Sequence, residues 1–292
     1  MIRSPHLTSN SGMVLNQTQS SGSSSRAPAN LNQPGLAAPG LTARTANPAK
    51  VEQVPAARDV ETLVKDFDSL FALSAGAAAD RDLLGRRQLA GRELLTTLSN
   101  LGEGGSRSIA QAFKQTDALR DKRLLAQSLG KIQDSQAVPV LKELLSSESG
   151  FYERKELIAS LAHRTEPAAI EPLSAVLTSQ QQGGLQFSAV QGLAGRAEAL
   201  PVLTATIENG NDQAVRLEAI RSVGLIRNDA AKNELITLAQ GASLESIIRQ
   251  TAIQELRRSF GPGAQDVLQT LSNDSEPAIR DTATQALAML RR

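Results

Sequence analysis

The sequence predicts an all-α fold, an α-solenoid of stacked helix pairs that follows a disordered N-terminal tail. Segments of similar pattern recur from residue 121 onward, and their starts lie 30 to 33 residues apart. Each repeat carries two apolar stripes at helical spacing, which is typical of a stack of helix pairs. The chain has no Cys, no Trp and an aromatic content of 2%. Its core must therefore be built from Leu, Ile, Val and Ala.

The tail, residues 1–58, differs in composition from the rest of the 292-residue chain. It contains eight Ser, repeated Pro, Gly and Asn, and five basic residues against the single acid Glu52, a net charge of +4. Because it has so little apolar surface to offset the entropy of ordering, we expect it to be disordered. It has no apolar run of the kind found in secretory signal peptides. Its composition resembles an organelle transit peptide or the leader of a bacterial type III secreted protein, and equally a plain flexible tail.

Residues 59–118 are expected to form N-terminal helices that cap the solenoid. The first would present Val60, Val64 and Phe67 on one face, and two more helices follow it. The Gly-rich segment 101–108 separates the second from the third. It lacks the Gly-Lys-Ser/Thr ending of a phosphate-binding loop and follows a helix where such a loop needs a strand. We therefore expect an interhelical turn with a serine N-cap.

Residues 119–292 are expected to form five full helix pairs and a C-terminal capping helix. The first helices align Leu129, Leu161, Leu193, Val223, Leu256 and Leu287 and, one turn earlier, Leu125, Leu157, Ala189, Ala219, Ala252 and Ala283. The second helices align Leu141, Leu173, Leu203, Leu235 and Leu268. The small residues of the second column allow the first helices to approach one another closely. The last helix needs a polar outer face, to which Arg280, Asp281, Thr284, Gln285, Arg291 and Arg292 would contribute.

Two segments, NDQAVRLEAIRSVGLI (211–226) and DSEPAIRDTATQALAML (274–290), resemble HEAT repeats of the short bacterial type, related to those of the phycobilisome-lyase group. The resemblance covers residues 119–292 and implies a solenoid of HEAT-like helix pairs, a fold that serves as a scaffold for many purposes. A basic column resembles the structural arginine of this family, which contacts polar groups at the end of the preceding unit. It consists of Lys122, Arg154, Arg216, Arg249 and Arg280, with Gln186 at the third position. A phosphate-binding stripe is the alternative, although acidic residues interleave with the column.

The sequence offers little for catalysis, so we expect no enzyme activity, no cofactor and no metal. The usual nucleophile, metalloprotease and dinucleotide motifs do not occur. His6 lies in the tail, and His163 lies near the end of a helix, where a histidine typically meets the last carbonyl groups. Metal binding by His163 with Glu166 and Glu171 is a minor alternative. The net charge of +1 gives no general attraction to nucleic acid, and no apolar run is long enough to insert in a membrane.

The second helices of a solenoid usually line its concave side, where ligands bind. Their outward ridge is expected to bind a partner through Val140, Glu143, Pro172, Ala175, Val202, Ala205, Glu234, Thr237, Val267 and Thr270. This ridge is mildly apolar and carries hardly any positive charge. It therefore favours a protein segment over nucleic acid. The alternative is that small ridge residues only permit tight curvature.

These observations predict a non-catalytic interaction scaffold or adaptor in the bacterial cytoplasm, with a protein as its partner. One alternative is a type III secreted effector, in which the tail is the export leader and residues 60–71 bind a secretion chaperone. The second alternative, which the family resemblance implies, is an accessory protein similar to a bilin lyase. The scarcity of aromatic residues and of a clustered acid–base set argues against that activity.

Overall fold

The computed structural model describes residues 59–72, 81–179 and 183–291, which all belong to one compact unit. The predictions for the tail, and for Arg292 in the polar end face, lie outside these residues. Every regular element within the described ranges is a helix, so the all-α prediction is confirmed. Among these helices, none combines the length and the hydropathy that crossing a bilayer requires.

The described ranges contain fourteen α-helices and three short 3-10 helices. The α-helices are α1 (Val60–Ala72), α2 (Arg81–Ser99), α3 (Gly105–Gln115), α4 (Leu119–Lys131), α5 (Ala137–Ser147), α6 (Phe151–His163), α7 (Ile170–Thr178), α8 (Gly183–Leu193), α9 (Leu200–Asn209), α10 (Gln213–Ile226), α11 (Asp229–Gln240), α12 (Ser246–Phe260), α13 (Gln265–Leu271) and α14 (Pro277–Leu290). The 3-10 helices Pro167–Ala169, Ala197–Ala199 and Gly261–Ala264 lead into α7, α9 and α13.

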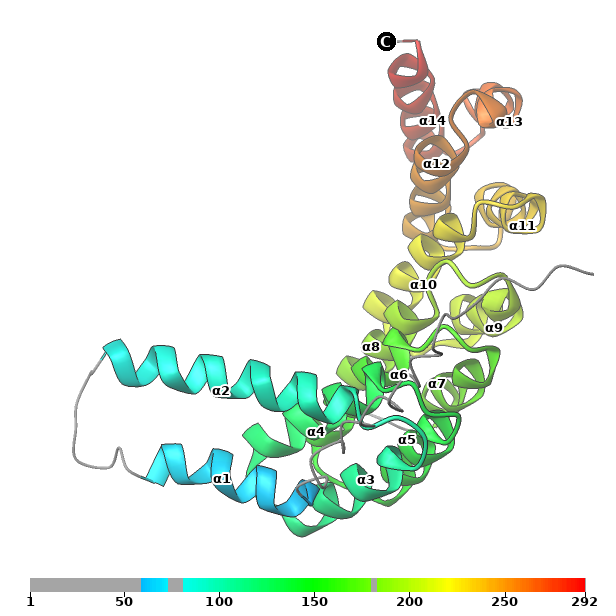
Figure 1. The fold of residues 1–292 in the computed structure, drawn as a ribbon. Coiled ribbons are helices and arrows are strands. Elements are labelled where there is room, and N and C mark those ends of the chain that lie inside the picture. The colour runs from blue at the N-terminus through cyan, green and yellow to red at the C-terminus, as the bar shows by residue number, and fades with distance from the viewer. Residues whose placement is uncertain (1–58, 73–80, 180–182, 292) are drawn as a thin grey trace, which may run out of the picture. The chain divides into compact units, whose positions relative to one another are not determined.

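The first helices of the pairs form a row in which each helix contacts the next, from α4 through α6, α8, α10 and α12 to α14 (Figure 1). Their apolar columns lie at these contacts. The column that begins with Leu129 is fully buried as far as Leu256, and Leu287 on α14 is 8% exposed. The two leucines and four alanines of the second column are likewise fully buried, from Leu125 to Ala283.

The second helices form another row, and each packs on the first helix of the following pair: α5 on α6, α7 on α8, α9 on α10, α11 on α12 and α13 on α14 (Figure 1). Their aligned leucines, Leu141, Leu173, Leu203, Leu235 and Leu268, are all fully buried. Each pair therefore buries its apolar faces against its neighbours, as expected for a solenoid.

The same arrangement extends upstream of residue 119, where the sequence predicted only capping helices. α2 contacts α4 as α4 contacts α6, and α3 contacts both α4 and α5. Leu94 and Leu98 of α2, buried at 7% and 0% exposure, lie 31 residues before Leu125 and Leu129. They continue both columns of the first helices. The helices α2 and α3 thus form a further helix pair of the stack, and α1 packs on both of them.

The Gly-rich segment before α3 is an interhelical turn, as predicted, but the expected serine N-cap is wrong. The N-cap residue is Gly104, whose φ of 85° lies in the left-handed region that favours glycine, and no side chain of the turn caps the helix. The cap comes instead from the next pair. Asp134, which is 2% exposed, accepts a hydrogen bond from the Ser106 N–H at 2.9 Å. A carboxylate at this end also interacts favourably with the helix dipole.

Candidate interaction surface

The structure places most of the predicted ridge on the surface, with two corrections. Glu143, Ala175, Ala205, Thr237 and Thr270 are exposed, and Val202, Glu234 and Val267 are half-buried. Val140 is only 8% exposed and Pro172 is buried, so their assignment to an outward ridge is wrong. The second helix α3 packs on α5 beside Val140 and reduces the exposure of that side chain. The helical step alone could not show this contact.

Two ion pairs join successive second helices near the N-terminal end of the ridge. Lys114 Nζ on α3 lies 2.6 Å from Glu143 Oε1 on α5, and Lys142 Nζ on α5 lies 2.7 Å from Glu171 Oε2 on α7. The hydrogen bond and charge of Lys114 lower the pKa of Glu143. All four side chains are at least half exposed. Solvent screens such pairs, so they orient neighbouring helices more than they stabilise them.

A groove of about 890 Å³ lies between α7 and α9 on the predicted ridge. Leu177, Val202 and Val215 supply its apolar side chains, and Ala205 and Asn209 also line it. None of the described residues that line it is a lysine or an arginine. A second groove, of about 440 Å³, lies between α3 and α5 and mixes the charges of Arg107, Lys114 and Glu143. The α7–α9 groove is thus the larger of the two and lacks positive charge.

The basic column holds the helix pairs together, as the family resemblance implied, at four of its positions. Arg216 Nε donates to the Ile207 carbonyl oxygen at 2.7 Å, and Arg249 Nε donates to the Ala239 carbonyl oxygen at 3.0 Å. Equivalent bonds join Arg280 Nη1 to the carbonyl oxygens of Asp274 and Ser275 (both 2.9 Å) and Gln186 Nε2 to those of Leu177 and Ser179 (both 3.2 Å). Gln186 therefore makes the same kind of bond to the preceding helix pair as the basic residues at the equivalent positions. The bonds of Gln186, Arg216 and Arg249 satisfy carbonyl groups at the end of the preceding second helix, which have no partner inside that helix, whereas Arg280 binds the segment between α13 and α14.

Lys122 and Arg154 depart from this pattern. Lys122 Nζ lies 5.2 Å from the centre of the Phe113 ring on α3 and 2.8 Å from Glu148 Oε2, which follows α5. Arg154 Nε is buried without a hydrogen-bond partner among the described residues.

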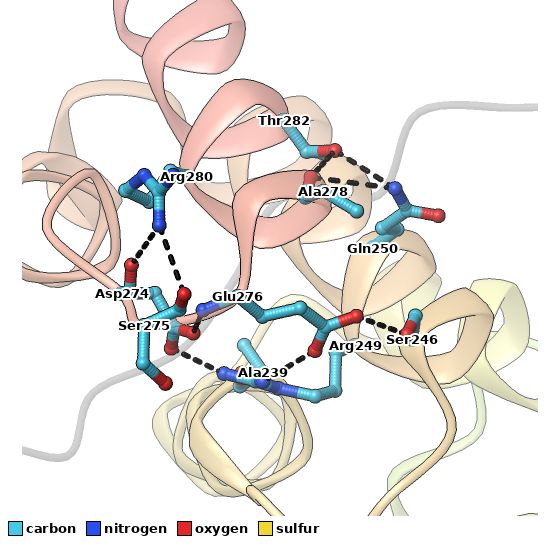
Figure 2. A network of polar contacts seen from close by, with 10 residues as sticks. All are labelled: Ala239, Ser246, Arg249, Gln250, Asp274, Ser275, Glu276, Ala278, Arg280 and Thr282. Carbon is cyan, nitrogen blue, oxygen red and sulfur yellow. Dashed lines mark hydrogen bonds and ion pairs between the residues drawn. The ribbon is translucent and has the colours of Figure 1, made fainter.

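Figure 2 shows the most extensive junction, where Arg249 on α12 meets the segment before α14. Arg249 Nη2 lies 2.5 Å from Asp274 Oδ2, and Nη1 lies 3.0 Å from Glu276 Oε2. The other carboxylate oxygen of Glu276 accepts a hydrogen bond from Ser246. The Glu276 N–H and then Arg249 lower the pKa of Asp274 against the effect of its burial. With its guanidinium group used in this way and its side chain 4% exposed, Arg249 cannot bind phosphate.

A column of acidic residues pairs with the basic column and was not predicted from the sequence. Lys122 pairs with Glu148, Arg216 with Glu245 at 2.6 Å, and Arg249 with Glu276. Each acid lies in the segment that leads into the next pair, so each base joins the pair before it to the pair after it. The sequence does indicate this acidic column in the last repeats, where an acidic residue precedes the basic residue by four positions. Those positions are Asp212 and Arg216, Glu245 and Arg249, and Glu276 and Arg280.

The two acidic residues of the minor metal alternative make other contacts. His163 is the exposed last residue of α6. Glu166 forms an ion pair with Arg164, and Glu171 pairs with Lys142. No group of three His, Cys, Asp or Glu residues that could hold a metal ion occurs among the residues the structure describes.

The repeat pattern matches a known family. HEAT repeats match over residues 108–194 and 200–288, which together make up more than half of the chain. This chain belongs to the HEAT-repeat family. The first HEAT match begins inside α3, upstream of the predicted repeat boundary at residue 119, in agreement with the packing of α3 on α4 and α5.

Comparison of this HEAT-repeat sequence with curated proteins finds no match. Among solved structures, human deoxyhypusine hydroxylase in complex with glycerol is similar, with 19% identity, a TM-score of 0.37, and coverage of 79% of this chain and 97% of that chain. An engineered protein has 21% identity and a TM-score of 0.35, covering 80% of this chain and 97% of its own. A designed armadillo repeat protein has 15% identity and a TM-score of 0.32, covering 79% and 99%.

Proposed function

We propose that this HEAT-repeat chain is a non-catalytic scaffold that binds a protein segment along the ridge of its second helices. The observation that carries the proposal is the groove of about 890 Å³ between α7 and α9. Its apolar side chains, Leu177, Val202 and Val215, can bury the apolar side chains of a partner. The absence of basic residues from its described lining argues against a nucleic acid, whose phosphates require Lys and Arg.

The polar part of the same groove supports a polypeptide as the occupant. Gln186, Asn209, Asn211 and Gln213 contribute side-chain amides to its lining. The Gln186 and Asn209 amides already donate to carbonyl oxygens of this chain, so they offer their oxygens as acceptors to the N–H groups of a peptide backbone. Apolar side chains combined with amides therefore suit a protein segment laid across α7 and α9. The exposed Ala175, Thr237 and Thr270 continue the same uncharged surface onto α7, α11 and α13.

A matched pair of substitutions tests this function. Ala205 on α9 lines the groove, whereas Ala159 on α6 is an exposed alanine of a first helix. Ala205→Arg should reduce the recovery of a specific partner at least tenfold in a quantitative pull-down, and Ala159→Arg should leave it unchanged. Both variants should unfold at the wild-type temperature, because both side chains are exposed. Equal recovery of the same partners by all three proteins would show that the ridge is not the binding surface.

A second proposal concerns the tail, whose Ser-rich composition and net charge of +4 favour an export leader. A chaperone on residues 60–71 would have to bind them before folding, since Val60, Val64 and Phe67 are at most 6% exposed in the folded chain. Deleting residues 1–50 should abolish transport of a fused reporter by a type III system and leave the thermal unfolding of the HEAT repeats unchanged. Continued transport of the shortened chain contradicts the proposal that the tail is the export leader. A full-length chain that is not transported either would favour the cytoplasmic location. We do not carry the bilin-lyase alternative forward, because no observation on the described residues favours it.

A further inference from the structure

We propose a second docking surface, the arginine groove, which lies between α1, α2 and α4 and binds an acidic amphipathic helix of a partner protein. The groove has a volume of about 490 Å³. It is formed by the first helices at the N-terminal end of the described residues, whereas the scaffold function was assigned to the second helices. Either proposal can therefore be wrong without affecting the other.

The floor of the arginine groove is apolar. Leu84 and Leu95 line it from α2, Leu124 from α4, and Phe67 and Phe71 from α1. Leu84 is 53% exposed, an unusual position for a large apolar side chain that has α1 and α4 close by. A partner that covered Leu84 would remove this apolar surface from water, which favours binding.

The rim of the groove is cationic. Arg87, Arg92, Arg120 and Arg123 line it, and none of its described lining residues is an Asp or a Glu. Arg120 is already paired with Asp68 and Asp121. Arg92 and Arg123 are exposed, and Arg123 Nε forms a long ion pair, at 3.6 Å, with Glu156 Oε1, which does not line the groove. The rim therefore keeps positive charge that an acidic partner would neutralise.

The aromatic rings of the groove argue against a nucleic acid as the occupant. Binding of single strands relies on aromatic faces on which bases stack. Phe67 is only 6% exposed. The ring of Phe71 is covered by the guanidinium groups of Arg120 and Arg87, whose central carbons lie 3.6 Å and 4.5 Å from its centre. Neither ring therefore offers a free face to a base.

Charge also selects among the protein occupants. The tail of this chain carries a net charge of +4, so the arginine rim would repel it. A second copy would bring the same four arginines to the same groove. An acidic segment of another protein has the complementary charge. A helix laid along α2 and α4 would place apolar side chains at positions i, i+3 or i+4, and i+7 in the groove, flanked by Asp and Glu at its rim.

Peptide display tests the proposal without a known partner. A library of displayed helical peptides, each about four turns long, is selected on the full chain, on Leu84→Glu, on Arg92→Glu and on the control Leu225→Glu. Leu225 lies on α10 and is 52% exposed, which matches the exposure of Leu84. Peptides enriched on the wild-type and control proteins should combine the helical apolar spacing with an excess of Asp and Glu. Their affinity, measured by fluorescence anisotropy, should fall at least tenfold with Leu84→Glu and with Arg92→Glu.

A charge exchange completes the test. An enriched peptide with Lys in place of its Glu residues should bind Arg92→Glu more tightly than it binds the wild-type protein, and added salt should weaken the original complex. Enrichment without acidic bias, or an equal loss of binding with Leu225→Glu, overturns the proposal. Competition by oligouridylate would identify a nucleic acid as the occupant and also overturn it. So would a dimer, detected by light scattering, that Leu84→Glu dissociates.

Discussion

Arg249 and Asp134 are buried charged residues that join one helix pair to the next. Arg249 is 3% exposed and lies on α12, between the end of α11 and the segment before α14. Asp134 is 2% exposed and lies in the turn between α4 and α5. Arg249 bonds the end of α11 and the segment before α14, and Asp134 bonds the Ser106 N–H of α3 as well as the Gln136 N–H of its own turn. Each therefore satisfies backbone or side-chain groups that would otherwise be buried without partners.

Removing Arg249 should strongly destabilise the chain. Arg249→Ala would leave the carboxylates of Asp274 and Glu276 and the Ala239 carbonyl group without this donor. Breaking one side of a buried ion pair costs about 3–5 kcal/mol. Denaturant unfolding should show this loss in Arg249→Ala and a change below about 0.5 kcal/mol in Lys155→Ala, a change at an exposed position. Equal midpoints for the two variants would contradict a structural role for the column.

Asp134 should make stability depend on pH in the acid range. Burial alone would raise its pKa, but hydrogen bonds from the N–H groups of Gln136 and Ser106 outweigh burial and lower the pKa from 3.8 to about 2. A carboxyl group with a depressed folded-state pKa contributes stability above its unfolded value and loses it as the pH falls through the folded value. The contribution of Asp134 is therefore complete above about pH 4 and disappears toward about pH 2.

The variant Asp134→Asn isolates this contribution. At pH 7 it should lower the free energy of unfolding by about 2 kcal/mol, because a charged acceptor bonds two buried N–H groups more strongly than an amide does. Urea unfolding of both proteins at several pH values should show the difference shrinking between about pH 4 and pH 2. A difference that stays constant over this range would show that the Asp134 charge is not its source.

At the scale of helices, the sequence predicted most of the stack, because burial in a repeat protein recurs at a fixed spacing. Leu129 and Leu161 occupy equivalent environments, so the same sequence pattern predicts the burial of both side chains. The predicted exposure of Val140 and Pro172 was wrong, because the 100° step between residues describes a single helix and carries no information on the helices that pack against it. The pair α2–α3 was missed although Leu94 and Leu98 continue the columns. The cap of α3 could not be found locally, because Asp134 lies 28 residues after Ser106.

Close contact between successive first helices should make Gly130 intolerant of substitution. A Cβ atom at Gly130, near the end of α4, would lie 3.1 Å from both the Cα and the carbonyl oxygen of Ser160 on α6. Gly130→Ala should therefore force the helices apart and cost about 1–3 kcal/mol. Gly85 on α2 is the matched control, because a Cβ atom there meets nothing within 4 Å. Gly85→Ala should stabilise the chain by about 0.5–1 kcal/mol through the restricted unfolded backbone and better helix propensity. Thermal unfolding should shift in opposite directions, and a common direction would contradict close packing at Gly130.

For the described stack as a whole, each helix pair contacts its immediate neighbours. In such a protein, stability is approximately a sum of the stabilities of the repeats and of the interfaces between adjacent repeats. A defect should then loosen the repeats beside it and leave distant ones protected. The contrast is a globular core, in which a cavity weakens the whole domain.

Two cavity substitutions measure how far a defect spreads. Leu193 on α8 is fully buried between neighbours on both sides, whereas Leu287 on α14 is 8% exposed and packs toward α12 and α13. Leu193→Ala should cost about 2–5 kcal/mol, and Leu287→Ala should cost less because part of its surface already faces water. Hydrogen exchange followed by mass spectrometry should show faster exchange in α6, α8 and α10 for Leu193→Ala and in α12 to α14 for Leu287→Ala. If either change accelerated exchange uniformly from α2 to α14, the stack would unfold as one cooperative unit. A partner bound on α7 and α9 would then stabilise all the pairs together rather than the two or three that it touches.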